Sequence, residues 1–200
     1  RLAKITTLLL LLQSLSCSKE PDRLDNFLVE FATTFKTDRY RFELDNGDIL
    51  IPLDVGDFNG NAGQRVILNY TPLKDDTISI NQVIPIFTGT ISYDEIPDID
   101  ITDPVKLRSA WVGGNYLNLI IETEYHSIAH ALLLNRDTGS PEIKLSLSYS
   151  RNNDPPGYPK VMYASFLIDD IRPETGSSPT PFVLIMNTHA GIRQINMELK

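Results

Sequence analysis

Apolar and polar residues alternate at period two through most of the chain after residue 26. That period is typical of β-strands with one buried face. In residues 27–36 the odd-numbered face carries Phe27, Val29, Phe31, Thr33 and Phe35. A helix would place Glu30 and Lys36 beside apolar residues, and the two threonines disfavour a helix. We therefore predict a first strand with these five residues on one face.

A hairpin is predicted over residues 40–53. Its turn is Asp45-Asn46-Gly47-Asp48, because Asn-Gly tolerates the positive φ angles that a type I′ turn needs. A two-residue loop at Asn46-Gly47 opposes apolar residues to apolar residues, and a slip of one residue would break this match. The predicted pairs are Leu44 with Ile49, Phe42 with Ile51 and Tyr40 with Leu53.

Residues 64–70 and 76–87 add further strands with the same period. Five short, strongly twisted strands in about sixty residues fit a small barrel of the OB type. We expect this OB-like domain to span residues 26–95. OB barrels often bind oligonucleotides or oligosaccharides, but an architecture does not by itself establish a function. The acidic, proline-containing stretch 94–103 is typical of a solvated linker, which we assign to residues 96–104.

A second domain is predicted over residues 105–200, beginning with a hairpin around the only tryptophan. A three-residue loop, Gly113-Gly114-Asn115, fits this hairpin, and Asn115 tolerates the αL conformation that such a loop requires. The predicted pairs are Leu107 with Ile121 and Trp111 with Leu117, whereas a loop at Gly113-Gly114 alone would oppose Leu119 to Arg108. We expect Trp111 to pack in the core and Leu117, Leu119, Ile121, Thr123 and Tyr125 to share one face.

More strands follow at 128–135, 142–149, 161–169, 181–187 and 192–199, separated by loops rich in Pro, Gly and Ser. About seven antiparallel strands joined by turns predict a β-sandwich. The expected fold class is therefore all-β, with a small OB-like barrel followed by an antiparallel β-sandwich.

The N-terminus has the features of a signal for export. Arg1 and Lys4 precede the apolar run 5–12, which is too short to span a bilayer. Cys17, the only cysteine, follows in a pattern that resembles the lipobox of bacterial lipoproteins, although Ser14 and Leu15 depart from it. We predict a signal peptide at 1–16, lipid attachment at Cys17 and a polar tether at 17–25. The alternatives are an ordinary secretory leader and a buried apolar helix.

The composition limits which classes of binding partner are expected. The formal net charge is −8, and the chain has no cluster of basic residues, so nucleic acid is not an expected partner. We expect acyl chains on Cys17 to hold the protein to a membrane, because two or more chains suffice for stable anchoring. A protein or a glycan of the envelope is the expected further partner.

Two segments carry oxygen ligands that a cation could use. Asp57, Asn59 and Asn61 have the one-three-five spacing of an EF-hand loop, but Ala62 replaces the expected Gly and Leu68 the expected Glu. A loop of residues that tolerate αL is the simpler interpretation of 54–63. We predict no metal site, and cation binding at 54–63 and 94–103 is left open.

No catalytic motif is present. His126 and His130 are four residues apart in a predicted strand, where we expect His130 to be a hydrogen-bonded core residue, and His189 has no evident partner. The chain lacks the sequence motifs of nucleophile elbows, zinc proteases and nucleotide-binding loops. We therefore expect neither catalytic residues nor a cofactor. Among aromatic residues that could contact a sugar or a peptide, Tyr158 is the one expected to be exposed.

Three motifs follow one another along the chain. They are Asp45-Asn46-Gly47, Gly63-Gln64-Arg65-Val66 and the stretch 111–119, Trp-Val-Gly-Gly-Asn-Tyr-Leu-Asn-Leu. Together they resemble motifs of NigD-like proteins, which are bacterial lipoproteins with an N-terminal OB domain and a C-terminal β-sandwich. The resemblance implies the same arrangement here, and it implies no activity, because none is established for the family.

We therefore expect a lipid-anchored protein of a Gram-negative cell envelope with a non-catalytic binding or structural role. Its expected place is the outer membrane, on the periplasmic or the surface face. The alternative is a secreted or envelope hydrolase whose site is assembled from distant residues.

Overall fold

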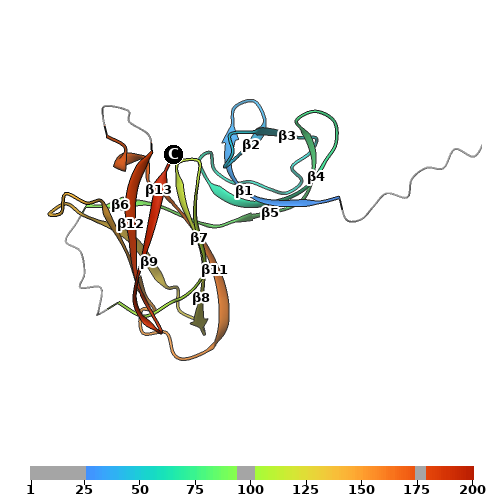
Figure 1. The fold of residues 1–200 in the computed structure, drawn as a ribbon. Coiled ribbons are helices and arrows are strands. Elements are labelled where there is room, and N and C mark those ends of the chain that lie inside the picture. The colour runs from blue at the N-terminus through green and yellow to red at the C-terminus, as the bar shows by residue number, and fades with distance from the viewer. Residues whose placement is uncertain (1–25, 94–101, 174–178) are drawn as a thin grey trace, which may run out of the picture.

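The computed structural model describes residues 26–93, 102–173 and 179–200 (Figure 1). The predicted signal peptide, Cys17 and the tether lie outside the described residues. Five strands close a barrel in the order β1-β2-β3-β5-β4, which confirms the predicted OB-like barrel. They are β1 (Leu28–Lys36), β2 (Tyr40–Leu44), β3 (Ile49–Pro52), β4 (Arg65–Pro72) and β5 (Thr77–Pro85). The buried barrel core consists of Ala32, Tyr40, Phe42, Leu44, Val66, Leu68, Tyr70 and Ile78.

The predicted apolar face of β1 is not the face that lines the barrel. Ala32 and Thr34 are fully buried instead, whereas Val29 and Phe35 are 53% and 41% exposed. Thr34 is accommodated inside because its hydroxyl donates a hydrogen bond to the Asn61 carbonyl at 2.5 Å. The odd-numbered residues of β1 therefore point outward, and Phe31 among them meets the second domain.

The predicted register of the β2–β3 hairpin is wrong by one residue. Phe42 opposes Leu50, and the loop has three residues, 45–47, with Gly47 at φ 91°. Gly47 N–H donates to Leu44 O at 2.9 Å. This register turns Leu50 toward the barrel core and leaves Ile49 about half exposed, so an apolar residue still fills the inside of the strand.

Eight further strands form the second sheet, which folds over one large core and confirms the predicted sandwich. They are β6 (Phe87–Ser92), β7 (Lys106–Gly113), β8 (Tyr116–Tyr125), β9 (Ala131–Asp137), β10 (Lys144–Ser150), β11 (Tyr158–Leu167), β12 (Thr180–Thr188) and β13 (Gly191–Leu199). Their order is β13-β12-β10-β9-β6-β11-β8-β7, and a 3₁₀ turn spans Asp169–Ile171. The sheet is mixed and not wholly antiparallel as predicted, because β6 runs parallel to β9 and β11, and β10 runs parallel to β12.

The chain enters the second sheet earlier than the predicted domain boundary. β5, the last barrel strand, ends at Pro85, and β6 pairs with β9 and β11 of the larger sheet. The change of sheet therefore falls at Ile86 and not after residue 95. Most of the predicted linker, 96–104, lies outside the described residues.

The tryptophan hairpin follows the predicted pairing at one end only. Leu107 opposes Ile121 as expected, but a bulge between Leu107 and Ser109 shifts the register, and Trp111 opposes Asn118 instead of Leu117. The loop is then the two residues 114–115, and only Gly114, at φ 56°, adopts a positive φ. Asn115 is not in the αL conformation that we predicted.

We predicted that Trp111 packs in the sandwich core, but the bulge turns its side chain away from that core. Because a bulge changes which residues share a face, Ala110 and Val112 pack on the core instead of Trp111. The Trp111 ring lies edge-on to Phe31 of the barrel, with 4.9 Å between ring centroids and 85° between planes. Trp111 is thus part of the contact between the domains.

Arg65 is the centre of that contact and is only 1% exposed. Its Nη1 donates to Thr33 Oγ1 in the barrel at 3.0 Å. Its Nη2 donates to Asn118 Oδ1 and its Nε to Ser165 Oγ in the sandwich, at 3.0 and 3.3 Å. Nη2 also lies 2.7 Å from Asp45 Oδ1 as an ion pair. One buried guanidinium therefore has partners in both domains.

The Asp45 carboxylate and a missing side chain complete this cluster. Asn118 Nδ2 donates to Asp45 Oδ2 at 2.8 Å. A Cβ on Gly113 would lie 2.2 Å from the same oxygen, so the strand can approach only with glycine there. Asp45, Arg65, Gly113 and Asn118 come from all three sequence motifs, and we call these four residues with Ser165 the interdomain cluster. Figure 1 shows the barrel beside the end of the sandwich where β7 and β8 meet.

Candidate functional site

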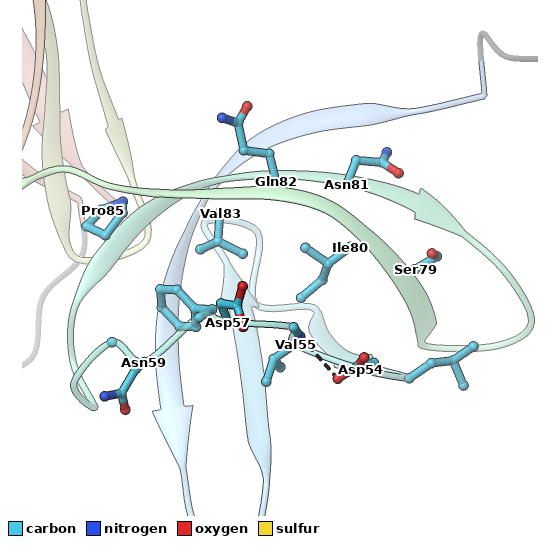
Figure 2. Close-up of a pocket in the computed structure, with 14 residues that line it drawn as sticks. Asp54, Val55, Asp57, Asn59, Ser79, Ile80, Asn81, Gln82, Val83 and Pro85 are labelled. Atoms are coloured by element: carbon cyan, nitrogen blue, oxygen red, sulfur yellow. Dashed lines mark hydrogen bonds between the residues drawn. The ribbon is translucent and has the colours of Figure 1, made fainter.

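An open groove of about 880 Å³ lies on the barrel. Loop 53–60, which connects β3 to β4, forms one wall, and β5 forms the other (Figure 2). We call it the barrel groove. Its lining residues are Leu53, Asp54, Val55, Gly56, Asp57, Phe58, Asn59, Gly60, Ser79, Ile80, Asn81, Gln82, Val83 and Pro85.

The groove is present because β3 pairs with only the first residues of β5. The two strands pair at only two positions, Ile51 with Thr77 and Pro52 with Ile78. A last backbone bond joins Leu53 N–H to Ile78 O at 3.0 Å. The loop then turns away, since Asp54 Oδ1 accepts the Gly56 N–H at 3.1 Å in an Asx turn. From Ser79 onward β5 has no strand beside it on this edge in the described structure.

The floor of the groove is apolar and held in place. Val55, Phe58, Ile80 and Val83 are partly buried and pack against the barrel core. The Phe58 ring contacts Tyr40 edge-on at 5.3 Å between centroids, so its orientation is fixed by core packing. Figure 2 shows Ile80 and Val83 directed from β5 toward the loop.

The polar residues of the groove give it a negative charge. Asp54 and Asp57 are exposed, and Figure 2 shows the Asp57 carboxylate directed toward β5. Asn81 points away from the loop in the same view, and its Nδ2 donates to Asn69 Oδ1 at 3.1 Å. No Lys, Arg, His or Cys is among the described residues that line the groove.

The loop 54–63, which we considered as a calcium site, contributes most of its residues to the groove wall opposite β5. Within this loop, the main-chain oxygen of Asn61 accepts a hydrogen bond from the Thr34 hydroxyl. Within 26–93, 102–173 and 179–200, no three His, Cys, Asp or Glu side chains gather as metal ligands would. Of the acidic stretch 94–103, only Thr102 and Asp103 are described, and Asp103 Oδ2 accepts the Arg151 N–H at 2.8 Å.

His130 is a hydrogen-bonded core residue, as the sequence predicted. Its Nε2 lies 3.1 Å from Asp154 Oδ2, and its Nδ1 lies 2.6 Å from the Tyr149 hydroxyl. An Nε2–H tautomer satisfies both contacts, with the tyrosine donating to Nδ1. His126 does not join it, because its Nδ1 contacts Ser127 Oγ at 2.9 Å and only its backbone N–H reaches Asp154.

Asp154 is the residue of this network that sequence reasoning missed. It accepts backbone N–H bonds from His126, Ser127 and Ile128 at 2.7–3.0 Å. Burial alone would raise the pKa of the Asp154 carboxyl, but these bonds and the His130 contact outweigh burial and hold that pKa far below its ordinary value. Nothing in a Pro- and Gly-rich loop signals a histidine partner 24 residues away.

This acid–histidine–tyrosine arrangement is sealed from solvent. The side chains of His130 and Asp154 are 1% and 0% exposed, and Tyr149 is 3% exposed. A substrate therefore has no contact with the imidazole. The network instead ties residues 126–130 to the loop 151–157, which passes so close that a Cβ on Gly157 would lie 2.0 Å from Tyr125 O.

The remaining candidates lie apart from the groove. Tyr158 is 59% exposed, as expected, and its ring meets Tyr125 edge-on at 6.1 Å. Trp111 packs on Phe31 at the domain contact, and Tyr116 lies beside the interdomain cluster, where its ring centroid is 4.3 Å from Arg65 Cζ. His189 is exposed between β12 and β13. No helix of the described residues is long and apolar enough to cross a membrane.

Comparisons with known proteins agree with this architecture. The family model for the NigD-like C-terminal beta sandwich domain matches residues 92–199. No curated protein matches the chain.

Solved structures share the whole fold. A protein from Parabacteroides distasonis, described as toxin-related, is 24% identical with TM-score 0.77, over 86% of this chain and 92% of that one. A NigD-like immunity protein from Bacteroides caccae is 22% identical with TM-score 0.66, over 84% and 91%. A protein from Bacteroides fragilis, described as a lipoprotein, is 14% identical with TM-score 0.64, over 87% and 98%. At these identities the likeness establishes the fold alone.

We predict that Asp154→Asn destabilises the protein in a pH-dependent way. Because the folded-state pKa of Asp154 lies below its unfolded value, the carboxylate contributes its full stability above a pH of about 4. That contribution is lost as pH falls through the folded-state pKa. Urea unfolding should therefore show a lower midpoint for the variant at pH 7 and a smaller difference at pH 3. Asp170→Asn, at an exposed site, is the control. Equal midpoints at pH 7, or a difference that grows in acid, would contradict this role.

Proposed function

The chain belongs to the NigD-like family, and from this premise we propose that it is a non-catalytic binding protein of the cell envelope. In this proposal the barrel groove receives a segment of another envelope protein. Acyl chains on Cys17 hold the molecule to the outer membrane of a Gram-negative bacterium. The neighbours described as an immunity protein and as a lipoprotein support a binding role and an envelope location.

The observation that carries this proposal is the form of the barrel groove. It is open and about 880 Å³ in volume, with an apolar floor and polar walls. Concave sites that combine apolar surface with directed polar groups are the usual places where proteins bind ligands. The groove residues lie outside the three motifs that form the interdomain cluster, so the groove is not part of that contact.

The described lining of the groove contains no serine paired with a histidine or lysine base. Ser79 is its only hydroxyl side chain among the described lining residues, and no histidine or lysine accompanies it. An activated nucleophile needs a general base within hydrogen-bond reach. The histidine–carboxylate pair that the structure does contain, His130 with Asp154, is buried in the other domain.

A polypeptide fits the groove better than a glycan does. Sugars are commonly held against an exposed aromatic face, and Phe58 is the only aromatic residue among the described lining residues. Its ring is partly buried and packs on Tyr40 and Phe42 at 5.3 and 6.0 Å between centroids. Apolar side chains of a peptide could instead cover Ile80 and Val83, which form the floor.

We predict that short peptides occupy the barrel groove. In NMR titrations of the full chain in detergent, a pool of random hexapeptides should shift the resonances of Val55, Ile80 and Val83. Maltohexaose should leave them in place. Leu133, exposed on the sandwich, is the internal control. The proposal fails if the peptide pool shifts none of the three groove residues, or if maltohexaose alone shifts them.

We predict that membrane association depends on Cys17. The Cys17→Ala variant cannot be acylated on sulfur, so it should move from the detergent phase to the aqueous phase on Triton X-114 partitioning. Ser18→Ala should remain in the detergent phase with the wild type. A Cys17→Ala variant as membrane-bound as the wild type would contradict lipid anchoring.

A further inference from the structure

We propose that the segment bound in the barrel groove is an extended polypeptide with alternating basic residues that pairs with the open edge of β5. This inference rests on the proposed function and specifies the ligand of the same site. It would extend the barrel by one strand, a mode of recognition in which main-chain hydrogen bonds give affinity and side-chain pockets give specificity.

The two edges of β5 are unequally paired. Along one edge β5 pairs with β4 from Ile78 to Pro85. Along the other edge β3 reaches only Thr77 and Ile78. No backbone hydrogen bond joins residues 79–85 to loop 53–60 in the part of the chain that the structure describes. An unpaired strand edge is a template for another strand.

The strand register identifies the backbone groups that face the groove. Ile78 O accepts the Leu53 N–H, so the backbone groups of Ile78 point toward β3. Two residues later, the backbone N–H and C=O of Ile80 point to the same edge of β5. A bulge opposite Asn69 and Tyr70 adds one residue to β5, which moves the next groove-facing position to Val83.

The C-terminal end of β5 shows the same alternation of backbone groups between β4 and the groove. Ile86 N–H donates to Arg65 O at 3.0 Å, so Ile86 faces β4 and Pro85 faces the groove. Proline has no N–H to leave unpaired, which suits an edge position. The open stretch 80–85 spans about 20 Å at about 3.3 Å per residue, the length of a segment of about six residues.

The charge of the groove favours a basic ligand. Asp54 and Asp57 are exposed on the wall opposite β5, and no basic residue is among the described lining residues. Figure 2 shows the Asp57 carboxylate directed across the groove. A strand that lies between the loop and β5 would place alternate side chains near these carboxylates. Lys or Arg at those positions gives opposite charges, and apolar residues at the others cover the floor.

The probe for this inference is a fluorescein-labelled hexapeptide of alternating Lys and Val, titrated against the full chain in detergent. Fluorescence anisotropy should show saturable binding, and amide hydrogen exchange should slow at Ile80 and Val83. The same peptide with N-methylated backbone amides cannot complete the ladder, so its affinity should fall at least about tenfold, the effect of one lost hydrogen bond of about 1.4 kcal/mol. A Glu-Val hexapeptide should bind at least about tenfold more weakly for reasons of charge.

A variant pair tests the carboxylates. Asp57→Lys should weaken Lys-Val binding by about fivefold or more, and Asp170→Lys, with the same change in net charge on the sandwich, should not. Equal binding of the N-methylated peptide would overturn strand addition, and equal binding of the Glu-Val peptide would overturn the charge argument. Either result leaves the groove as a peptide site. Absence of groove shifts with the random pool would instead overturn the proposed function.

Discussion

The burial of the Arg65 guanidinium is the constraint on which the arrangement of the two domains depends. A buried charge is tolerated only when its hydrogen-bonding groups are matched. Arg65 finds these partners partly in the barrel, at Thr33 and Asp45, and partly in the sandwich, at Asn118 and Ser165. Removing one partner of a buried ion pair costs about 3–5 kcal/mol, because the other charge is left without its partner, so loss of Arg65 would destabilise the contact between the domains. The two domains are therefore expected to behave as one unit.

This constraint changes the interpretation of the sequence motifs. The three motifs that resemble those of NigD-like proteins supply Asp45, Arg65, Gly113 and Asn118, and these four residues join the domains. The barrel groove is formed by 53–60 and 79–85, outside all three motifs. In this chain the residues of these motifs thus hold the two domains together, whereas the proposed ligand contacts belong to a part of the barrel that the motifs do not include.

The sequence predicted most strands and both architectures, because period two is a local property of each segment. It did not predict features set by distant partners. The bulge after Leu107 leaves no sequence signal, yet it moves Trp111 from the core to the domain contact. The register at Asn46-Gly47 was ambiguous, because apolar residues occupy both faces of β3. The groove is set by the residue at which β3 stops pairing with β5. The role of Asp154 is set by its contact with a histidine in another loop.

The most direct test of this account is differential scanning calorimetry of the full chain and its Arg65→Met variant. Methionine keeps much of the apolar volume but leaves Asp45 without its cation. We expect one unfolding transition for the wild type and two separated transitions for the variant, because barrel and sandwich then unfold independently. A single transition in both proteins, at the same temperature, would contradict the claim that Arg65 holds the domains together.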